Sequence, residues 1–220
     1  ADAAQSTGKR SMVWHQAVPE RSILPVNHHP RIDAGVFVGS LYAPRDRWVS
    51  ELGGLVSQVE CPESDAFQWL FEHSHEWIQR AFDRTRDRDP WWARRVHAIY
   101  NRLQVGIRRH SFNSFLSTIR HGVAVVNLPS QVKGYSGRVV EGMAAGRPVL
   151  PQRISGAPLF AEGREILHYS DVDELGDHIR RLQQNPETGN LIARNARAAL
   201  LARHTVEIRT AELLAFAEGA

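Results

Sequence analysis

The sequence has little cysteine, little lysine and no long apolar run, and each shortage excludes a class of protein. Cys61 is the only cysteine, which rules out an internal disulfide and a cysteine-based zinc site. No stretch approaches the roughly 20 consecutive apolar residues that a membrane-spanning helix needs. The first residues also lack the apolar core of a secretory signal. We therefore expect a cytoplasmic protein without a transmembrane segment, in which Cys61 is a small core residue.

The positive charge comes almost entirely from arginine. The 220 residues include 25 arginines but only two lysines, Lys9 and Lys133, and the formal net charge is +3. Arginine binds phosphate well, but this charge spread over the whole chain is a weak indication of nucleic-acid binding. Most arginines alternate with acidic residues on expected helices, as in 84–89, which is typical of a solvated helix face. An arginine-rich nucleic-acid-binding protein is therefore a hypothesis that the interleaved acids argue against.

The order of predicted strands and helices indicates an α/β fold. A strand over 34–40, a helix over 44–52 and a strand over 55–61 form one βαβ unit, which implies a parallel sheet. The apolar run 122–129 is typical of a central parallel strand that is buried on both faces. We predict a Rossmann-like doubly wound parallel sheet over 31–220. Its remaining elements are strands over 147–151 and 165–170, and helices over 172–184, 187–203 and 206–217, with Asp171 and Glu174 as a capping box and Thr205 as a cap.

Two segments depart from this α/β pattern. Residues 1–30 show no periodicity and contain two prolines that disfavour helix, so we expect an extended arm or linker. Residues 64–121 have helical periodicity, broken at Asp89–Pro90. We predict a helical insertion or an enlarged crossover of three helices, the last over about 111–121. We expect Trp91 and Trp92 to be buried anchors rather than a platform for a ligand. The apolar residues of the first two helices are Phe67, Leu70, Phe71, Trp77 and Ile78, and then Val96, Ile99, Tyr100 and Leu103.

The segment 122–151 is the most informative about function. Its apolar strand leads through a glycine-rich turn, with Gly134 and Gly137, into a helix whose first N–H groups and dipole favour an anion. The spacing is not Gly-x-Gly-x-x-Gly, and no Walker Lys-Ser/Thr pair follows, so a dinucleotide dehydrogenase and a P-loop NTPase are disfavoured. Glu141 lies one turn into this helix. It can accept both hydroxyls of a ribose, or it can be an exposed glutamate favoured by the helix dipole.

Histidines raise the question of a metal site. His28, His29, His73 and His75 form close pairs, but no carboxylate or cysteine lies at ligand spacing from them. We therefore expect surface or packing roles for these residues and no metal site.

The sequence 133–209 resembles the C-terminal half of two-domain (GT-B type) glycosyltransferases, of the glycosyl transferases group 1 type and its spore-maturation-like branch. In that family a Gly-aromatic-Gly turn leads to a helix with a glutamate, then to small residues, a glycine and Pro-Val. Residues 36–45 resemble the first strand of the same domain, and the resemblance covers roughly 31–217, with 64–110 as its poorest part. The matching residues are Gly134, Tyr135, Ser136, Glu141, Ala144–Gly146, Pro148–Val149, Gly163–Glu165, Asp171–Leu175 and His204–Thr205.

The resemblance implies a donor-binding site. Glu141 would hold the ribose, and the backbone at Gly137, Arg138 and Val139 would hold the diphosphate. Arg45 would be a phosphate partner or a plain surface arginine, and the side chain of Arg138 would reach phosphate or lie in solvent. Four further residues belong to the loops of the same expected site: Gly39, Gly134, Tyr135 and Ser136.

Lys133 is a departure from the family pattern. Retaining members carry a glutamate eight positions before the ribose glutamate, and this chain has Lys133 there. Its cation can neutralise the leaving diphosphate, which would make it a catalytic residue, or it can be an ordinary loop residue. The donor sugar and the stereochemical outcome therefore stay open.

The expected function is that of the donor-binding half of a glycosyltransferase. Its substrate would be a UDP- or GDP-linked sugar, with no cofactor and an unknown acceptor. The resemblance does not include an acceptor-binding domain, so we expect a fragment, one half of a split enzyme or a degenerate single-domain relative. The acceptor-binding domain or a partner chain would complete the enzyme. The alternative is a non-catalytic nucleotide-sugar-binding or assembly module of the same fold.

Overall fold

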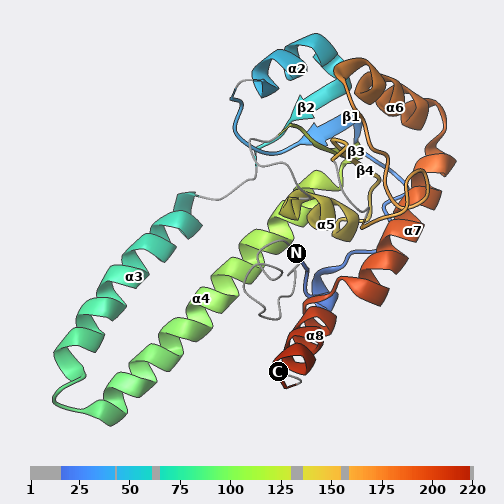
Figure 1. Ribbon diagram of the computed structural model, residues 1–220. Helices are drawn as coiled ribbons and strands as arrows, with labels where there is room; N and C mark the ends of the chain where they lie inside the picture. Colours follow the sequence, from blue (N-terminus) through green and yellow to red (C-terminus); the bar gives the residue numbers. More distant parts are fainter. Residues whose placement is uncertain (1–15, 43, 61–64, 130–135, 155–158, 219–220) are drawn as a thin grey trace, which may run out of the picture. The chain divides into compact units, whose positions relative to one another are not determined.

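The computed structural model describes residues 16–42, 44–60, 65–129, 136–154 and 159–218, without the side chains of 65–72. A four-stranded sheet with the order β2-β1-β3-β4 forms the centre of its larger unit (Figure 1). Every pair of neighbouring strands is parallel, which confirms the predicted α/β fold. The strands are β1 (Ile32–Phe37), β2 (Val56–Gln58), β3 (Gly122–Asn127) and β4 (Val149–Pro151).

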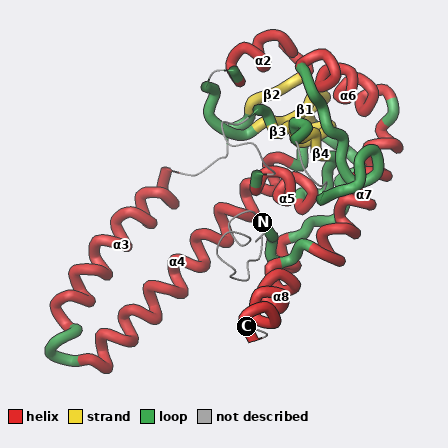
Figure 2. The backbone as a smooth tube through the Cα atoms, in the orientation of Figure 1, coloured by secondary structure: helices red, strands yellow, loops and turns green. Residues whose placement is uncertain are grey.

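Helices make up most of the remaining described chain (Figure 2). The α-helices are α2 (Arg45–Leu52), α3 (Asp65–Thr85), α4 (Pro90–Ile119), α5 (Gly137–Ala144), α6 (Val172–Gln184), α7 (Pro186–Arg203) and α8 (Val206–Glu218). Two short 3₁₀ helices, η1 (Glu20–Ser22) and η2 (Gly53–Leu55), complete the list.

Neighbouring residues of β3 face opposite sides of the sheet, and each side is covered by a helix. Val125 lies against α5, where a Cβ added to Gly142 would be only 3.0 Å from it. Val126 faces the other side, where it and Ile179 of α6 lie close to Gly35 of β1. Because side chains alternate along a strand, an apolar run such as β3 is expected when both faces are buried.

The first turn of α6 carries the predicted cap with one change. The carboxylate of Asp171 accepts the backbone N–H of Glu174 at 2.9 Å, as predicted. The carboxylate of Glu174 accepts the N–H of Ser170 at 2.7 Å, one residue before the N-cap. The Thr205 hydroxyl accepts the N–H of Ile208 at the start of α8, also as predicted.

The prediction of a strand over 165–170 is wrong. The segment runs beside β4, and the N–H groups of Leu167 and Tyr169 donate to β4 carbonyls at 3.1 Å. Its bridges are isolated, one between Gln152 and Tyr169 and one between Glu162 and Ile166. Residues 165–169 are buried although they form no continuous strand, so the apolar run indicates burial.

Residues 16–30 belong to the larger unit and pack against the end of α5. The N–H of Leu24 donates to the carbonyl of Ala144 at 2.7 Å, and that of Asn27 donates to Gly146 at 3.1 Å. The buried guanidinium of Arg147 donates to the carbonyls of Asn27 and Val123. Burial lowers the pKa of Arg147 to about 10. Apart from η1 and the bridge at Val18, this segment has no regular secondary structure, and it is fastened to the end of α5.

Residues 61–115 form a compact unit of their own, whereas residues 1–60 and 116–220 form the larger one. The prediction of a separate helix over about 111–121 is wrong, because α4 runs without a break to Ile119. Within the smaller unit, the ring of Tyr100 on α4 lies 5.6 Å from that of His75 on α3. Among the described residues, no helix combines the length and the apolarity needed to cross a membrane.

The expected burial of Trp91 and Trp92 is also wrong, and two members of the predicted apolar sets are exposed as well. Trp77 and Ile99 are each 62% exposed, Trp91 is 53% exposed and Trp92 is 47% exposed. Two helices that form one thin unit can each bury only a narrow stripe against the other. Helical periodicity alone does not show how many neighbours a helix has.

Candidate functional site

The sheet order places a topological switch point between β1 and β3. The chain leaves β1 towards β2 on one side and leaves β3 towards β4 on the other (Figure 1). In open α/β sheets, ligands bind in the crevice at the carboxyl ends of the strands at such a point. The loops after β1 and β3 therefore frame the candidate site.

On the β1 side, Arg45 connects the two loops. Its Nε donates to the carbonyl of Pro129, after β3, at 2.7 Å. Its Nη1 lies 3.3 Å from the carbonyl oxygen of Ser40, and its guanidinium lies 4.3 Å from the centre of the Tyr42 ring. Gly39 has φ 151°, which permits the turn that leads to Arg45. A guanidinium has five N–H donors, so Arg45 keeps donors for a phosphate, and that role stays a prediction.

On the β3 side, Asn127 ties the end of the strand to the start of α5. Ser136, the residue before α5, donates its hydroxyl to Oδ1 of Asn127 at 3.2 Å. The buried hydroxyl of Tyr169 donates to the carbonyl of Asn127 at 2.7 Å, and burial raises the pKa of Tyr169. The entry to α5 is therefore fixed relative to the sheet edge.

The carboxylate of Glu141 lies beside the first turn of α5. A Cβ added to Gly137 would be 3.4 Å from Oε1 of Glu141. Oε2 of Glu141 is 3.1 Å from Nη1 of Arg138, and the Glu141 side chain is only 25% exposed. Burial raises the pKa of Glu141, although the neighbouring Arg138 opposes this shift. The site thus holds an acceptor next to the N–H groups that open the helix.

The structure brings most of the predicted site residues to this edge. Gly39 and Arg45 come from the β1 side. The β3 side contributes Ser136, Gly137, Arg138, Val139 and Glu141. The side chain of Val139 is fully buried, so only its backbone can face a ligand. Three predicted residues lie outside the described residues: Lys133, Gly134 and Tyr135.

Sequence reasoning missed Gln16 and Asn127. The amide oxygen of Gln16 would be 2.8 Å from a Cβ added to Gly137, so this side chain covers the first turn of α5. No pattern in residues 1–30 indicates that contact. Asn127 was findable, because it is a polar residue at the carboxyl end of an apolar strand, where ligands bind.

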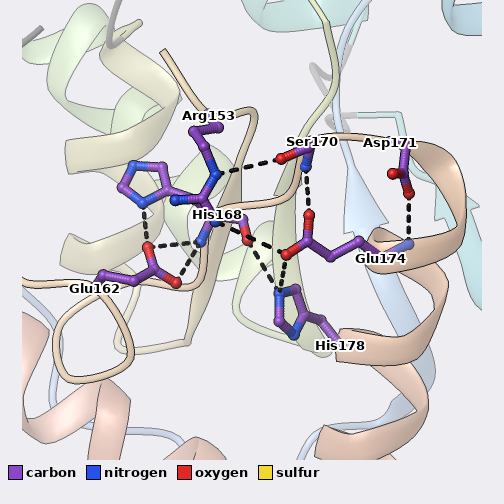
Figure 3. A network of polar contacts seen from close by, with 7 residues as sticks. All are labelled: Arg153, Glu162, His168, Ser170, Asp171, Glu174 and His178. Atoms are coloured by element: carbon purple, nitrogen blue, oxygen red, sulfur yellow. Dashed lines mark hydrogen bonds and ion pairs between the residues drawn. The ribbon is translucent and has the colours of Figure 1, made fainter. Parts of the chain in front are cut away.

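A polar network fixes the segment that follows β4 (Figure 3). The Glu162 carboxylate contacts the imidazole of the buried His168 and accepts its backbone N–H at 3.1 Å. Nε2 of His178, on α6, lies 3.0 Å from the carbonyl oxygen of His168. Nε of Arg153 donates to the Ser170 hydroxyl at 3.3 Å. The network connects the end of β4 with α6, and only its capping residues were predicted.

We expect Glu162→Ala to lower the free energy of unfolding by about 1–2 kcal/mol, because it removes acceptors from a buried imidazole and a backbone N–H. Glu162→Gln retains one acceptor oxygen and should cost less. Urea unfolding followed by circular dichroism would measure both. Glu76→Ala removes an exposed ion pair with Arg80 and should have a much smaller effect. Equal effects of Glu162→Ala and Glu76→Ala would contradict a structural role for the network.

Among the described residues, no group of three or more His, Cys, Asp or Glu side chains is arranged to hold a metal ion. Arg45 and Arg138 are the cationic side chains that the described residues place at the site.

Comparison with known proteins identifies the family and the fold of the chain. The glycosyl transferase-like family model matches residues 64–215, so it includes the helices that resembled the family least. Sucrose-phosphate synthase from Thermosynechococcus elongatus is similar in fold, with a TM-score of 0.59 and 13% identity over 99% of this chain and 55% of that chain. Anabaena HepE in complex with UDP-glucose has a TM-score of 0.52 and 15% identity over 84% of this chain and 48% of that chain.

A search of the curated proteins found no match. The chain spans about half the length of the solved structures that it matches. At such low sequence identity, the structural likeness shows a shared fold alone. That fold is one half of a GT-B enzyme. Because the family model covers most of the chain, the chain belongs to the glycosyl transferase-like family.

Proposed function

We propose that this chain is the donor-binding half of a glycosyltransferase, and that it binds a nucleoside-diphosphate sugar at the carboxyl edge of β1 and β3. The observation that carries the proposal is the partly buried Glu141 carboxylate, held beside the first turn of α5. A ribose needs an acceptor for two hydroxyls, and a diphosphate needs N–H groups and a positive dipole. Both needs are met within one turn of α5.

The remaining roles follow from this placement. The backbone of Gly137, Arg138 and Val139 would hold the diphosphate, while Arg45 would contact it from the β1 side. Lys133 would neutralise the leaving diphosphate. The bound ligands of HepE, UDP-glucose and UDP, make UDP the first nucleotide to test. Transfer itself would need an acceptor-binding domain, supplied by the same protein or by a partner chain.

The proposal is tested by calorimetric titration of the chain with UDP and GDP. We expect saturable binding of one of them with a Kd in the micromolar-to-millimolar range, a free energy of roughly 4–8 kcal/mol. Glu141→Ala should weaken this binding, because the ribose hydroxyls lose their acceptor. The matched control is Glu212→Ala, which removes a glutamate that pairs with Arg209 at the same three-residue spacing on α8.

Two results would count against the proposal. Binding that is unchanged in Glu141→Ala would place the nucleotide elsewhere. Failure of the folded chain to bind either nucleotide would favour the alternative of a non-catalytic assembly module.

A further inference from the structure

Helix α4 carries a charge pattern that no other described α-helix shares. It contains five arginines and no aspartate or glutamate over its 30 residues. On α2 and α8, by contrast, an arginine pairs with an acid of its own helix: Arg47 with Glu51 and Arg209 with Glu212. Among the carboxylates whose side chains the structure describes, none pairs with an arginine of α4. Positive charge is therefore concentrated on this helix without local compensation.

Three of these arginines alternate with apolar residues along one face. Positions three or four apart lie on the same side of an α-helix. Trp91 is 53% exposed, Ile99 is 62% exposed and Val105 is 53% exposed, and the arginines between them are exposed too. We call this set the α4 stripe: Trp91, Arg95, Ile99, Arg102, Val105 and Arg109.

The stripe lies on the face of α4 opposite its buried residues. Ala93, Gln104 and Ile107 are buried, and on a helix they point away from the stripe. The guanidinium of Arg95 lies 4.0 Å from the centre of the Trp91 ring, a cation–π contact that holds both groups at the surface. The exposed apolar residues are therefore features of the outer surface and do not fill the small core of this unit.

We propose that the α4 stripe docks on the anionic phospholipid headgroups of a membrane surface. Arginine binds phosphate with parallel hydrogen bonds, and its apolar stem can lie among acyl chains while its head stays at the headgroups. Tryptophan is enriched at membrane interfaces, and single aliphatic residues can insert shallowly. A nucleic acid could be bound by the arginines through its phosphates and by Trp91 through base stacking, but Ile99 and Val105 cannot stack on bases. The lipid surface fits the whole stripe and requires no helix that crosses the bilayer.

Co-sedimentation of the full chain with vesicles tests this proposal. Vesicles of phosphatidylcholine with about 30% phosphatidylglycerol should bind the chain, and pure phosphatidylcholine vesicles should bind it far more weakly. Replacing Arg95, Arg102 and Arg109 together by glutamine should lower the partition coefficient by about 100-fold, because each arginine near an anionic surface contributes several-fold. Trp91→Ala should also weaken binding, which charge alone would not explain.

The matched control is a triple variant with the same loss of charge in the same unit. Arg84, Arg86 and Arg88 alternate with acids near the end of α3, and their replacement by glutamine should leave most of the binding intact. Equal losses in the two triple variants would overturn the proposal, because they would show an effect of net charge alone. Binding of a single-stranded oligonucleotide through the stripe, without binding to anionic vesicles, would overturn it in favour of a nucleic acid. Each result is independent of nucleotide binding at α5, since that titration uses no lipid.

Discussion

Replacing Gly146 with alanine should lower the free energy of unfolding by about 3 kcal/mol, a large effect for the addition of one methyl group. Gly146 follows α5 with φ 73°, where a side chain costs about 1 kcal/mol or more. An added Cβ would also lie 2.5 Å from the carbonyl oxygen of Pro25 and 3.0 Å from the Cα of Val26. Those atoms belong to the backbone, so a rotamer change cannot relieve the clash. The segment 16–30 would have to move away from α5.

Gly163→Ala is the matched control for this prediction. Gly163 has φ 71°, almost the same as Gly146, but an added Cβ would meet nothing within 4 Å. It should therefore show only the conformational cost of about 1 kcal/mol. Urea unfolding of both variants separates that cost from the contact with residues 16–30. Equal destabilisation would mean that the contact at Pro25 contributes nothing.

The parallel sheet could be predicted because its signal is local. The apolar run of β3 and the βαβ order of β1, α2 and β2 each follow from residues within a short window. The packing of residues 16–30 could not be predicted in the same way. It depends on carbonyl groups near Gly146 and on the buried guanidinium of Arg147, which lie more than 100 positions away in the sequence.

The segments that form the candidate site could be predicted from the sequence, but the contacts that hold these segments together could not. Glu141 and Gly137 belong to one continuous segment, so their proximity follows from helix geometry. The contact of Arg45 with Pro129 joins two loops 84 positions apart, and only the sheet order shows that they meet. The exposed Trp91 was expected to be buried because an apolar residue on a helix normally faces a core. Trp91 is exposed because the unit has too few helices to cover it, which the periodicity of the sequence does not show.

The second large effect concerns the affinity for nucleotide. Glu141→Gln should weaken binding of UDP, or of GDP if that is the ligand, by about 10- to 100-fold, because a neutral amide keeps one acceptor where two ribose hydroxyls need a charged carboxylate. Binding by the wild type should also weaken as pH falls through the pKa of Glu141, which burial has raised. The variant should lack this pH dependence. Calorimetric titration between about pH 4 and pH 7 would compare the two proteins.

The same substitution should leave the free energy of unfolding at neutral pH unchanged or higher. A carboxyl whose pKa is raised on folding binds its proton more tightly in the folded state. The wild type therefore loses stability as pH rises from the unfolded pKa through the folded one, and this loss persists above that range. Glutamine cannot ionise, so the variant does not lose stability as pH rises. The variant also lacks the ion pair with Arg138, but that pair is partly exposed and contributes little to the free energy of unfolding.

Weaker nucleotide binding together with unchanged or higher stability would show that Glu141 is kept for the ligand at a cost to the fold. Weaker binding with lower stability would instead assign Glu141 a structural role, because removal of a carboxylate that stabilises α5 would lower both the stability and the affinity for nucleotide. Glu212→Gln, with its pair to Arg209 at the same spacing, should leave binding unchanged. The two measurements on one variant therefore distinguish a binding residue from a packing residue, which neither measurement does alone.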